Sequence, residues 1–588
     1  MAFNKIPFFS LLFTFALNIP STATANEPAN TDSVIIRALK DELYRSINQL
    51  HDKETGNPFF ISYTYLDGEV AEASALLGAL NSSNKYSSTS WGIRLMMGDY
   101  DVNDENFQDN FSREQTDNIP ITRQPPIEPD YEGIRNTFWW NTGNVFQSAV
   151  RNYKSKLAAL KDKPIAESHN LLPDFTRAEP VKIYRNSSTG MVSKEKLEIF
   201  VKDISNVFRE YKEVSFSNVS AYQFKSNVYI FNTEGSEAVI PLNIITMDIS
   251  ASVYSPKGEV FRNSISFVGK SIEDFPMTDS IKNAVRALAK YLLELRQAEI
   301  INEKYTGPVL FEGKVASGII AGCLFGNEKQ FVADRDLLVN SLSKNMLPKN
   351  TYSRESKLEK RIVSKDITVK ALSHLKEYKG IPLMGAFELD AECIVPPDEI
   401  VLVEKGILKN MFCDRIPTKN FRQSNGHNRI GLSYGGFTTG IAPGVILVES
   451  ENRSDASALR QKIIESAIDR GLEYVIIVKP LIGGMCHSPY CFYKLDVNTG
   501  KEKLVYQMSL PAMELKYLNK ITGTGSGTIV NNHVFNHSNY RSMASKSGFP
   551  ASFITPDAML VDEMELGPVF PYSDMDLPFY DNQLNNDE

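Results

Sequence analysis

A long stretch of alternating apolar and polar residues, from Glu213 to Val268, constrains the fold of this chain more than any other feature. Alternation with period two places successive side chains on opposite faces of a strand, as in an antiparallel sheet with one buried face. Turn residues at Gly235 and at 256–258 divide the stretch into consecutive strands. The sequence therefore predicts an antiparallel meander in this region.

Helices and further strands are predicted on both sides of the meander. Apolar residues at helical spacing predict helices at 33–51, 144–162, 193–211 and 278–303. Runs of aromatic and β-branched residues predict strands at 59–66, 76–80 and 86–98, the first ending in a turn at Asp67-Gly68. Residues 100–132 are rich in Asp, Asn, Glu and Pro, and we expect a long surface loop there.

The character of the sequence changes after Tyr305-Thr306, where we place a domain boundary. About 560 residues are too many for a single core, so two or three domains are expected. Residues 26–306 are predicted to form a layered α/β domain, and 307–575 a mainly antiparallel β domain with helices at 314–325 and 454–470. The class is α+β, and residues 576–588 form an acidic tail.

The first 25 residues have the pattern of a signal peptide. Lys5 precedes an apolar run at 8–17, and small residues at 21–25 provide an A-x-A cleavage site, so cleavage is predicted after Ala25. The run is about ten residues long, whereas a membrane-spanning helix needs about 20. We therefore expect a periplasmic or secreted protein without a transmembrane anchor.

Composition excludes one class of partner. The net charge is −8 and the pI is about 5.6, which argues against a broad nucleic-acid surface, because such a surface needs clustered Lys and Arg. Five cysteines are present and no C-x-x-C pair occurs. An odd number leaves at least one thiol unpaired. Cys486 and Cys491 could form a disulfide or remain two free thiols, and the sequence leaves both readings open.

Several segments of the second half occur in a familiar order. Gly307–Gly313 (GPVLFEG) leads into a helix of small residues, and strand, turn and polar segments follow it. These segments are 307–313, 388–392, 403–409, 424–429, 470–474, 549–554 and 560–563. In this order and at these distances they resemble the C-terminal domain of the TldD/PmbA (TldD/TldE) family of metallopeptidase-related proteins, and the first half fits the family more loosely.

The resemblance implies a dimer that encloses a cavity for unfolded peptides. One branch of the family carries zinc on a helix with the motif H-E-x-x-x-H, in which two imidazoles bind the ion and the carboxylate activates water. Here the helix at that position, 315–326, has no His and no carboxylate. The chain is therefore similar to the partner branch that lacks the peptidase site, or to a separate secreted branch with its own chemistry, and we expect no metal ligands in this helix and no cofactor.

Polar residues in two other segments are candidates for binding. Asp390 and Glu392 would alternate on one face of a strand, an arrangement useful for metal or acid–base work or simply an exposed strand face. Asn425, His427 and Arg429 lie in a polar turn. They could line a cavity, where Arg429 would bind a peptide carboxylate, or they could bond the backbone of their own turn.

Other potential ligands are weaker. His533 and His537 have i,i+4 spacing, but their Asn-rich surroundings favour a loop over a helix. Cys486, His487 and Cys491 offer soft donors without a fourth ligand. The Gly-rich segment 523–527 has neither a nucleophile elbow nor the Lys of a P-loop, so a flexible loop is expected there.

Three functions follow from these observations. The first is an exported, peptide-handling or partner subunit without the family's usual zinc site, which forms a homodimer or a heterodimer with a related chain. The second is an active metallopeptidase with zinc on non-standard ligands such as His427, the His533/His537 pair or the Cys486/His487 cluster. The third is a non-enzymatic carrier or assembly protein of the cell envelope.

Overall fold

The structure is a computed structural model of the 588-residue chain. It describes residues 30–108, 122–161, 172–187, 190–255, 258–326, 331–335, 337–339, 354–433, 436–481, 490–536 and 547–570. The predicted signal peptide and the acidic tail lie outside these residues, as do Cys486, His487 and His537. No helix within the described part is both long and apolar enough to cross a membrane.

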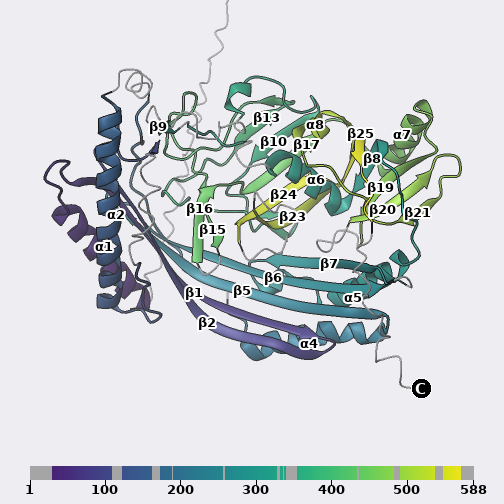
Figure 1. Ribbon diagram of the computed structural model, residues 1–588, viewed down its shortest axis with the longest axis horizontal. Helices are drawn as coiled ribbons and strands as arrows, with labels where there is room; N and C mark the ends of the chain where they lie inside the picture. Colours follow the sequence, from purple (N-terminus) through teal and green to yellow (C-terminus); the bar gives the residue numbers. More distant parts are fainter. Residues whose placement is uncertain are drawn as a thin grey trace, which may run out of the picture.

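A long, curved sheet forms the base of the molecule (Figure 1). Its strands run in the order β2-β1-β5-β6-β4, and β7 also pairs with β6. The predicted meander is confirmed, since β5, β6 and β7 are consecutive and antiparallel. The bounds are β1 Pro58–Leu76, β2 Ala79–Met97, β4 Lys182–Tyr184, β5 Val214–Asn232, β6 Glu237–Tyr254 and β7 Val260–Gly269.

The turn predicted at Asp67-Gly68 does not exist, because β1 continues through it. Asp67 lies opposite Thr89 of β2 and Asn227 of β5, so strands on both sides supply partners for its backbone. Gly68 tolerates this position because it has no side chain: a Cβ there would lie 3.0 Å from Cβ of Ser226. The segment 76–80, for which a strand is predicted, instead contains the turn between β1 and β2.

Four helices cover one face of this sheet. α1 (Asn30–Gln49) and α2 (Tyr131–Ala159) pack at one end, over Tyr63 and Tyr65 of β1. α4 (Lys194–Ser205) and α5 (Thr278–Leu295) pack at the other end, over the alanines of β1 and β5. α2 starts earlier than predicted, because the Asp130 carboxylate caps it by accepting the Gly133 N–H at 2.7 Å.

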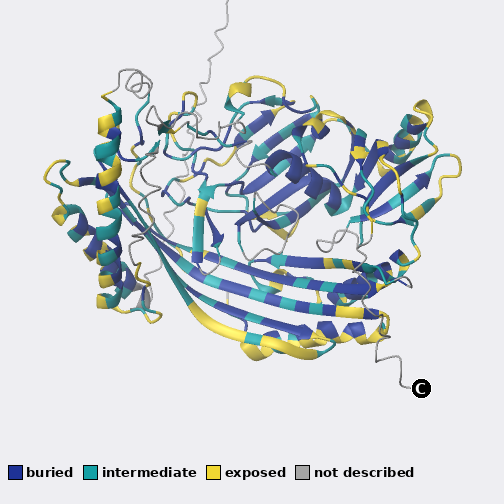
Figure 2. Ribbon diagram, in the orientation of Figure 1, coloured by how far each residue is buried: buried dark blue, intermediate teal, exposed yellow. Residues whose placement is uncertain are grey.

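The opposite face of the sheet holds the second half of the chain. Leu66, Phe224 and Ile230 of the sheet pack against Met384 and Leu432 of the second half. Residues in the middle of the sheet are therefore buried on both faces, whereas β2 forms an exposed edge (Figure 2). Alternation alone could not predict this arrangement, because it signals only one buried face.

The second half contains two further sheets. The first has the order β14-β13-β10-β17-β24-β23, and the second has the order β18-β22-β25-β8-β19-β20-β21. The bounds of the first are β10 Ile367–Ala371, β13 Ile400–Glu404, β14 Ile407–Leu408, β17 Val445–Ser450, β23 Thr528–Phe535 and β24 Phe549–Pro556. Those of the second are β8 Tyr305–Glu312, β18 Arg453–Ser454, β19 Tyr474–Pro480, β20 Tyr490–Asp496, β21 Glu502–Val505, β22 Ile521–Gly525 and β25 Ala558–Leu566.

Smaller elements complete the described part. β15 (Asn428–Ser433) and β16 (Gly436–Ile441) form a hairpin that reaches β2. The remaining strands are short pairs: β3 Phe107–Gln108 with β9 Leu338–Val339, and β11 Glu377–Tyr378 with β12 Ile381–Pro382. The remaining helices are α7 Ala456–Asp469, α8 Leu515–Asn519 and the 3₁₀ turns Asn206–Glu210, Ile272–Asp274 and Glu355–Lys357.

Helix α6 (Gly313–Phe325) runs between the two sheets of the second half. It contacts β23 and β24 on one side and β8, β19 and β25 on the other. Every residue from Val315 to Phe325 is buried. A helix buried on all sides is apolar on all sides, which explains the small and aliphatic composition of the segment.

Three predictions in the second half are wrong. Residues 388–392 are not a strand, because Asp390 fixes a turn there through backbone hydrogen bonds. The Asn-rich segment at 531–535 lies in β23 rather than in a loop, because it pairs with β24. Residues 523–525 lie in β22 because they pair with β25. In the two strand cases a neighbouring strand outweighs the local preference for a turn.

Gly406 lies in the turn between β13 and β14 with φ of +80°. A Cβ at this position would lie 2.4 Å from the Val363 carbonyl oxygen. We therefore expect Gly406→Ala to lower the free energy of unfolding by on the order of 3 kcal/mol, because left-handed backbone strain and a clash add together. The matched control is Gly500→Ala, which has φ of +66° but nothing within 4 Å of the new Cβ, and should cost about 1 kcal/mol. Equal urea midpoints for the two variants would contradict this prediction.

Candidate functional site

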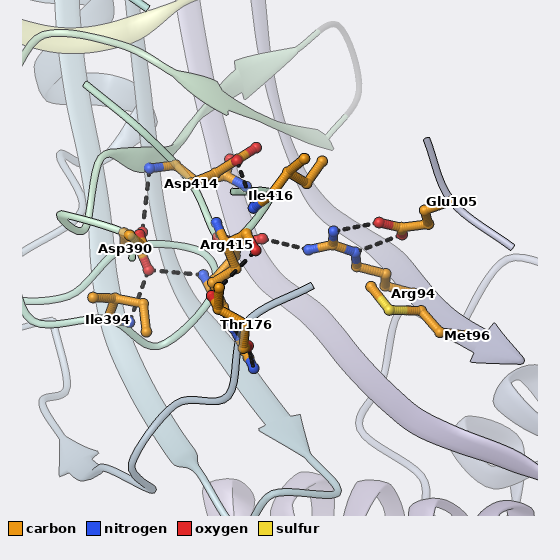
Figure 3. A network of polar contacts seen from close by, with 12 residues as sticks. Arg94, Met96, Glu105, Thr176, Asp390, Ile394, Asp414, Arg415 and Ile416 are labelled. Carbon is orange, nitrogen blue, oxygen red and sulfur yellow. Dashed lines mark hydrogen bonds and ion pairs between the residues drawn. The ribbon is translucent and has the colours of Figure 1, made fainter. Parts of the chain in front are cut away.

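A network of charged side chains lies at the junction between the long sheet and the second half (Figure 3). The second half contributes Asp390, Glu392, Asp414 and Arg415 from two loops. The first half contributes Arg94 at the end of β2, and Glu105, Thr176 and Glu234 from loops. Because buried charges are stable only when paired or hydrogen-bonded, the contacts of each group decide what it can do.

Arg415 is the largest fully buried side chain in the described part of the protein, with 1% of its surface exposed. Its Nη1 and Nη2 donate to the two carboxylate oxygens of Glu234, at 2.7 and 2.6 Å. Its Nε donates to the Thr176 carbonyl at 2.9 Å, and its guanidinium lies 4.0 Å from the ring centre of Phe175. Arg415 therefore fixes the second half to the first through a bidentate ion pair.

Arg94 forms a second connection. It donates to both oxygens of Glu105, at 2.7 and 2.6 Å, and also to Glu392 Oε1. Burial by itself would lower the pKa of Arg94, but the two carboxylates outweigh burial and raise it, so the guanidinium stays charged. The other Glu392 oxygen accepts the backbone N–H of Arg415 at 2.9 Å. Glu392 thus joins the two arginines rather than facing solvent.

Asp390 is fully buried and organises a turn. Its Oδ1 accepts the backbone N–H groups of Glu392 and Ile394, at 2.9 and 2.8 Å. Its Oδ2 accepts the N–H of Asn428 at 3.2 Å. Burial, followed by the charge of Glu392, raises the pKa of Asp390 well above its ordinary range. The carboxyl group shapes two loops and has no free oxygen directed at a ligand.

Asp414 is the acidic group of this network that titrates near neutral pH. Burial, followed by repulsion from Glu392, raises the pKa of Asp414 to about 7. A hydrogen bond from the Ile416 N–H at 2.9 Å opposes this shift only in part. Asp414 was not among the residues singled out from the sequence, because no local pattern reveals its distance from Glu392.

His427 is completely buried, in contact with two aromatic rings. It stacks on Phe412 with 4.2 Å between ring centres and meets Phe387 edge-on at 5.6 Å. Burial lowers the pKa of His427 to about 3, so the imidazole is neutral. Nδ1 lies 2.9 Å from the Asn425 carbonyl, which can only accept, so Nδ1 carries the proton and Nε2 accepts from Ser373 Oγ at 3.3 Å. Both nitrogens are therefore engaged.

Asn425 and Arg429 also bond to backbone. Asn425 accepts from the Cys413 N–H at 3.0 Å and donates to the Met411 carbonyl at 2.8 Å. Arg429 Nη1 donates to the Pro443 and Pro550 carbonyls, at 2.6 and 2.9 Å. The structure thus brings Asp390, Glu392, Asn425 and His427 together as a framework of loops, and Arg429 lies at its edge without a carboxylate partner in the described part.

Helix α6 does not fit a zinc ion. Zinc in proteins is held by imidazole, thiolate or carboxylate groups, and between Val315 and Phe325 the only such group is the thiol of Cys323. Burial raises the pKa of that thiol far above neutrality, and a protonated thiol is a poor ligand. The remaining polar side chain of this segment, the Ser317 hydroxyl, is buried and has no hydrogen-bond partner among the residues that the structure describes. No step of a metal-dependent mechanism can be assigned to these residues.

The other potential ligands that the structure describes lie in different sheets. His533 lies in β23 opposite Ala551, so it does not form a helical pair with His537, which lies outside the described residues. Cys491 is buried in β20 beside Tyr291, while Cys486 and His487 also lie outside the described part. Among the described residues, no three His, Cys, Asp or Glu side chains are arranged to hold a metal ion.

Sequence reasoning missed the residues that complete the network, namely Arg94, Glu234 and Arg415. Each belongs to a segment with no motif of its own, and the partners are distant in sequence: 298 positions separate Arg94 from Glu392, and 181 separate Glu234 from Arg415. No spacing rule links such pairs. The sequence pointed to Asp390 and Glu392 and to the polar turn at 425–429, but not to the arginines and carboxylates that pair across the junction.

Comparison with known proteins gives matches to one family and one fold. Residues 302–567 match the model of the PmbA/TldA metallopeptidase C-terminal domain. No individual curated protein is similar enough in sequence to count as a match.

Three solved structures share the fold at TM-scores of 0.53. A proposed modulator of DNA gyrase from Thermotoga maritima is 13% identical, with 91% of this chain and 99% of that chain covered. TldE from Thermococcus kodakarensis is 13% identical, with coverage of 90% and 100%. A proposed modulator of DNA gyrase from Bacteroides thetaiotaomicron is 10% identical, with coverage of 92% and 100%. The α+β class and the mostly antiparallel sheets are thereby confirmed.

Proposed function

The second half of this chain belongs to the TldD/PmbA family, whose fold extends over most of the chain, and from this premise we propose that the protein is an exported, peptide-handling or partner subunit without the family's usual zinc site. The observation that carries the proposal is helix α6, which is buried between two sheets and offers no imidazole and no carboxylate. Without such ligands, a metal ion cannot be held there to activate water for peptide hydrolysis.

The charged network supports a binding role over an acid–base role. Asp414 accepts the Ile416 N–H through one oxygen, whereas the other carboxylates of the network accept hydrogen bonds from Arg94, Arg415 or backbone N–H groups at both oxygens. The His427 imidazole is neutral, and both of its nitrogens are engaged. A general base needs a free lone pair within reach of its substrate. Groups that are fully engaged instead hold the loops and the two halves in a fixed relation, as a binding surface requires.

Metal analysis and a peptidase assay test the proposal together. Protein purified without added metal should contain far less than one zinc ion per chain. It should leave casein and short peptides uncleaved, with or without added zinc, while still binding peptide. Stoichiometric zinc together with chelator-sensitive cleavage by the lone chain would instead establish an active metallopeptidase with non-standard ligands.

Export and pairing are separate parts of the proposal. If residues 1–25 are a signal peptide, the mature N-terminus of protein from the periplasmic fraction or the medium should begin at Asn26. An uncleaved N-terminus in the cytoplasmic fraction would refute export. Light scattering on the purified chain should show a dimer, or a monomer that becomes a heterodimer when a related subunit is added. A chain that stays monomeric with every related subunit would refute the pairing.

A further inference from the structure

The end of the long sheet that carries α4 and α5 presents a polar face on the side of the second half (Figure 1). Along β5, the side chains on this face include Phe224 and Val228, which pack against the second half. Toward the start of the strand, the same face carries Ser220 and Asn218 instead. The same change from apolar to polar residues occurs at the corresponding positions of β1, β6 and β7. The opposite face of this end stays apolar, because α4 and α5 pack on it.

The strand register places these polar side chains in two rows that cross the sheet. The first row, from β2 to β7, consists of Ser82, Ser74, Ser220, Asp248 and Ser266. The second row, from β5 to β7, consists of Asn218, Ser250 and Ser264. Neighbouring strands lie about 4.8 Å apart, so each row offers polar groups at short and regular intervals. We call the side chains of these two rows the serine platform.

The serine platform has hydrogen-bonding capacity that the protein does not use. The hydroxyls of Ser74 and Ser82 share one hydrogen bond at 2.7 Å, and Ser266 donates to Asp248 at 2.9 Å. A hydroxyl can donate once and accept twice, so one bond leaves further capacity. Among the described residues no hydrogen-bond partner is found for the other side chains, Asn218, Ser220, Ser250 and Ser264, and none of the four is buried. Their polar groups are therefore accessible to a ligand.

We propose that the serine platform binds the backbone of an extended, uncharged peptide segment, largely independently of its side chains. The inference rests on the proposed peptide-handling function and names the part of the peptide that is recognised. Each peptide group offers one donor and one acceptor, and hydroxyl and amide side chains can satisfy both. Tyr86, which lies on the same face of β2 and is 50% exposed, adds aromatic contact area. Antibody paratopes combine Tyr, Ser and Asn for the same physical reasons.

The composition of the serine platform favours a peptide over other ligands. The two rows contain no Lys or Arg, so a phosphate or a nucleic acid would find no opposite charge there. Their one carboxylate, Asp248, would repel an acidic segment. The core of an interface between two copies is usually apolar, whereas these rows contain no apolar side chain. The match to a metallopeptidase C-terminal domain favours a peptide over a saccharide, which could also bond to hydroxyls.

The test measures, by calorimetry, how tightly the full-length chain binds a hexapeptide of Ala, Asn and Thr with both termini blocked. Scrambled orders of the same residues should bind within about threefold of one another, whereas N-methylation of alternate peptide groups should weaken binding about tenfold, because it removes donors. Ser220→Ala combined with Ser250→Ala should also weaken binding about tenfold, and Ser220→Thr, which keeps the hydroxyl, should not. The matched control is Ser87→Ala, which removes an exposed hydroxyl from the opposite face of β2, where Ser87 lies opposite Glu69. This control should leave the affinity unchanged.

Failure of the serine platform and failure of peptide handling give different results. If the unmodified chain binds none of these peptides, both proposals are refuted. If it binds them and the double variant, with a normal thermal unfolding curve, binds equally tightly, only the platform is refuted, and the same holds if N-methylation has no effect. Tighter binding of cellohexaose, lost in the double variant, would assign the rows to a saccharide and overturn the peptide assignment. A dimer that becomes monomeric in the double variant would overturn it too, because the platform would then be a contact between copies.

Discussion

Replacing Arg415, which lies at the junction of the two halves, with methionine is expected to lower the free energy of unfolding of the protein by about 3–5 kcal/mol. Methionine keeps much of the apolar stem but removes the guanidinium, so Glu234 loses its bidentate partner and the Thr176 carbonyl loses its donor. A largely buried carboxylate that loses its cation, and keeps only neutral donors such as the Tyr100 hydroxyl, costs far more than the ion pair itself contributes. Urea-induced unfolding, followed by the fluorescence of the tryptophans and by circular dichroism, measures the loss.

Two further variants separate this explanation from a general loss of packing. Adding Glu234→Gln to Arg415→Met should restore more than half of the lost stability, because glutamine is uncharged and can still accept the Tyr100 hydroxyl. The matched control is Arg286→Met, which breaks an exposed pair with Glu210 and should cost less than about 1 kcal/mol. If the double variant were no more stable than Arg415→Met alone, the unpaired carboxylate would not be the cause.

Replacing Asp414 with asparagine is expected to stabilise the protein by about 2 kcal/mol at about pH 8. The unfolded chain loses this proton at about pH 3.9, whereas the folded protein holds it until about pH 7. Between these values the folded state binds the extra proton, so stability falls as the pH rises and the loss is complete above about pH 7. The full difference between the pKa values of Asp414 in the unfolded and folded protein would correspond to about 4 kcal/mol. We expect about half of this free energy as stabilisation, because Asp414 keeps some contact with solvent.

Asparagine removes the charge and keeps an oxygen that can accept the Ile416 N–H. The stabilisation should therefore shrink as the pH is lowered and disappear near pH 4, where both forms are neutral. Asp455→Asn provides a control of opposite sign: Asp455 caps α7 by accepting the Ala458 N–H, and its hydrogen bonds lower its pKa. That variant should lose stability at about pH 8. A constant effect of Asp414→Asn between pH 4 and 8 would exclude titration as its origin.

Much of the architecture could be predicted from local patterns. Alternation over 213–268 predicted the meander, and the predicted bounds of α4, α5, α6 and α7 agree with the structure to within a few residues, except at the C-terminal ends of α4 and α5. Two of the errors, at 67–68 and 531–535, share one cause, which is pairing with distant segments. Asp67-Gly68 resembles a turn but lies in β1 between two neighbouring strands, and 531–535 resembles a loop but pairs with β24. Backbone groups satisfied by a neighbouring strand outweigh local propensity.

The sequence by itself determined what helix α6 cannot do, because ligand chemistry depends on residue type and no arrangement turns alanine or glycine into a zinc ligand. It also identified Asp390 and Glu392 in one segment, and Asn425, His427 and Arg429 in another, as candidate polar residues. Only the tertiary structure decided how these residues are used. It joined Glu392 to Arg94, joined Arg415 to Glu234, and left Arg429 without a carboxylate among the described residues. The physical reason is that charge pairing depends on distance in space and on exclusion of water, and neither quantity is encoded in the spacing of residues along the chain.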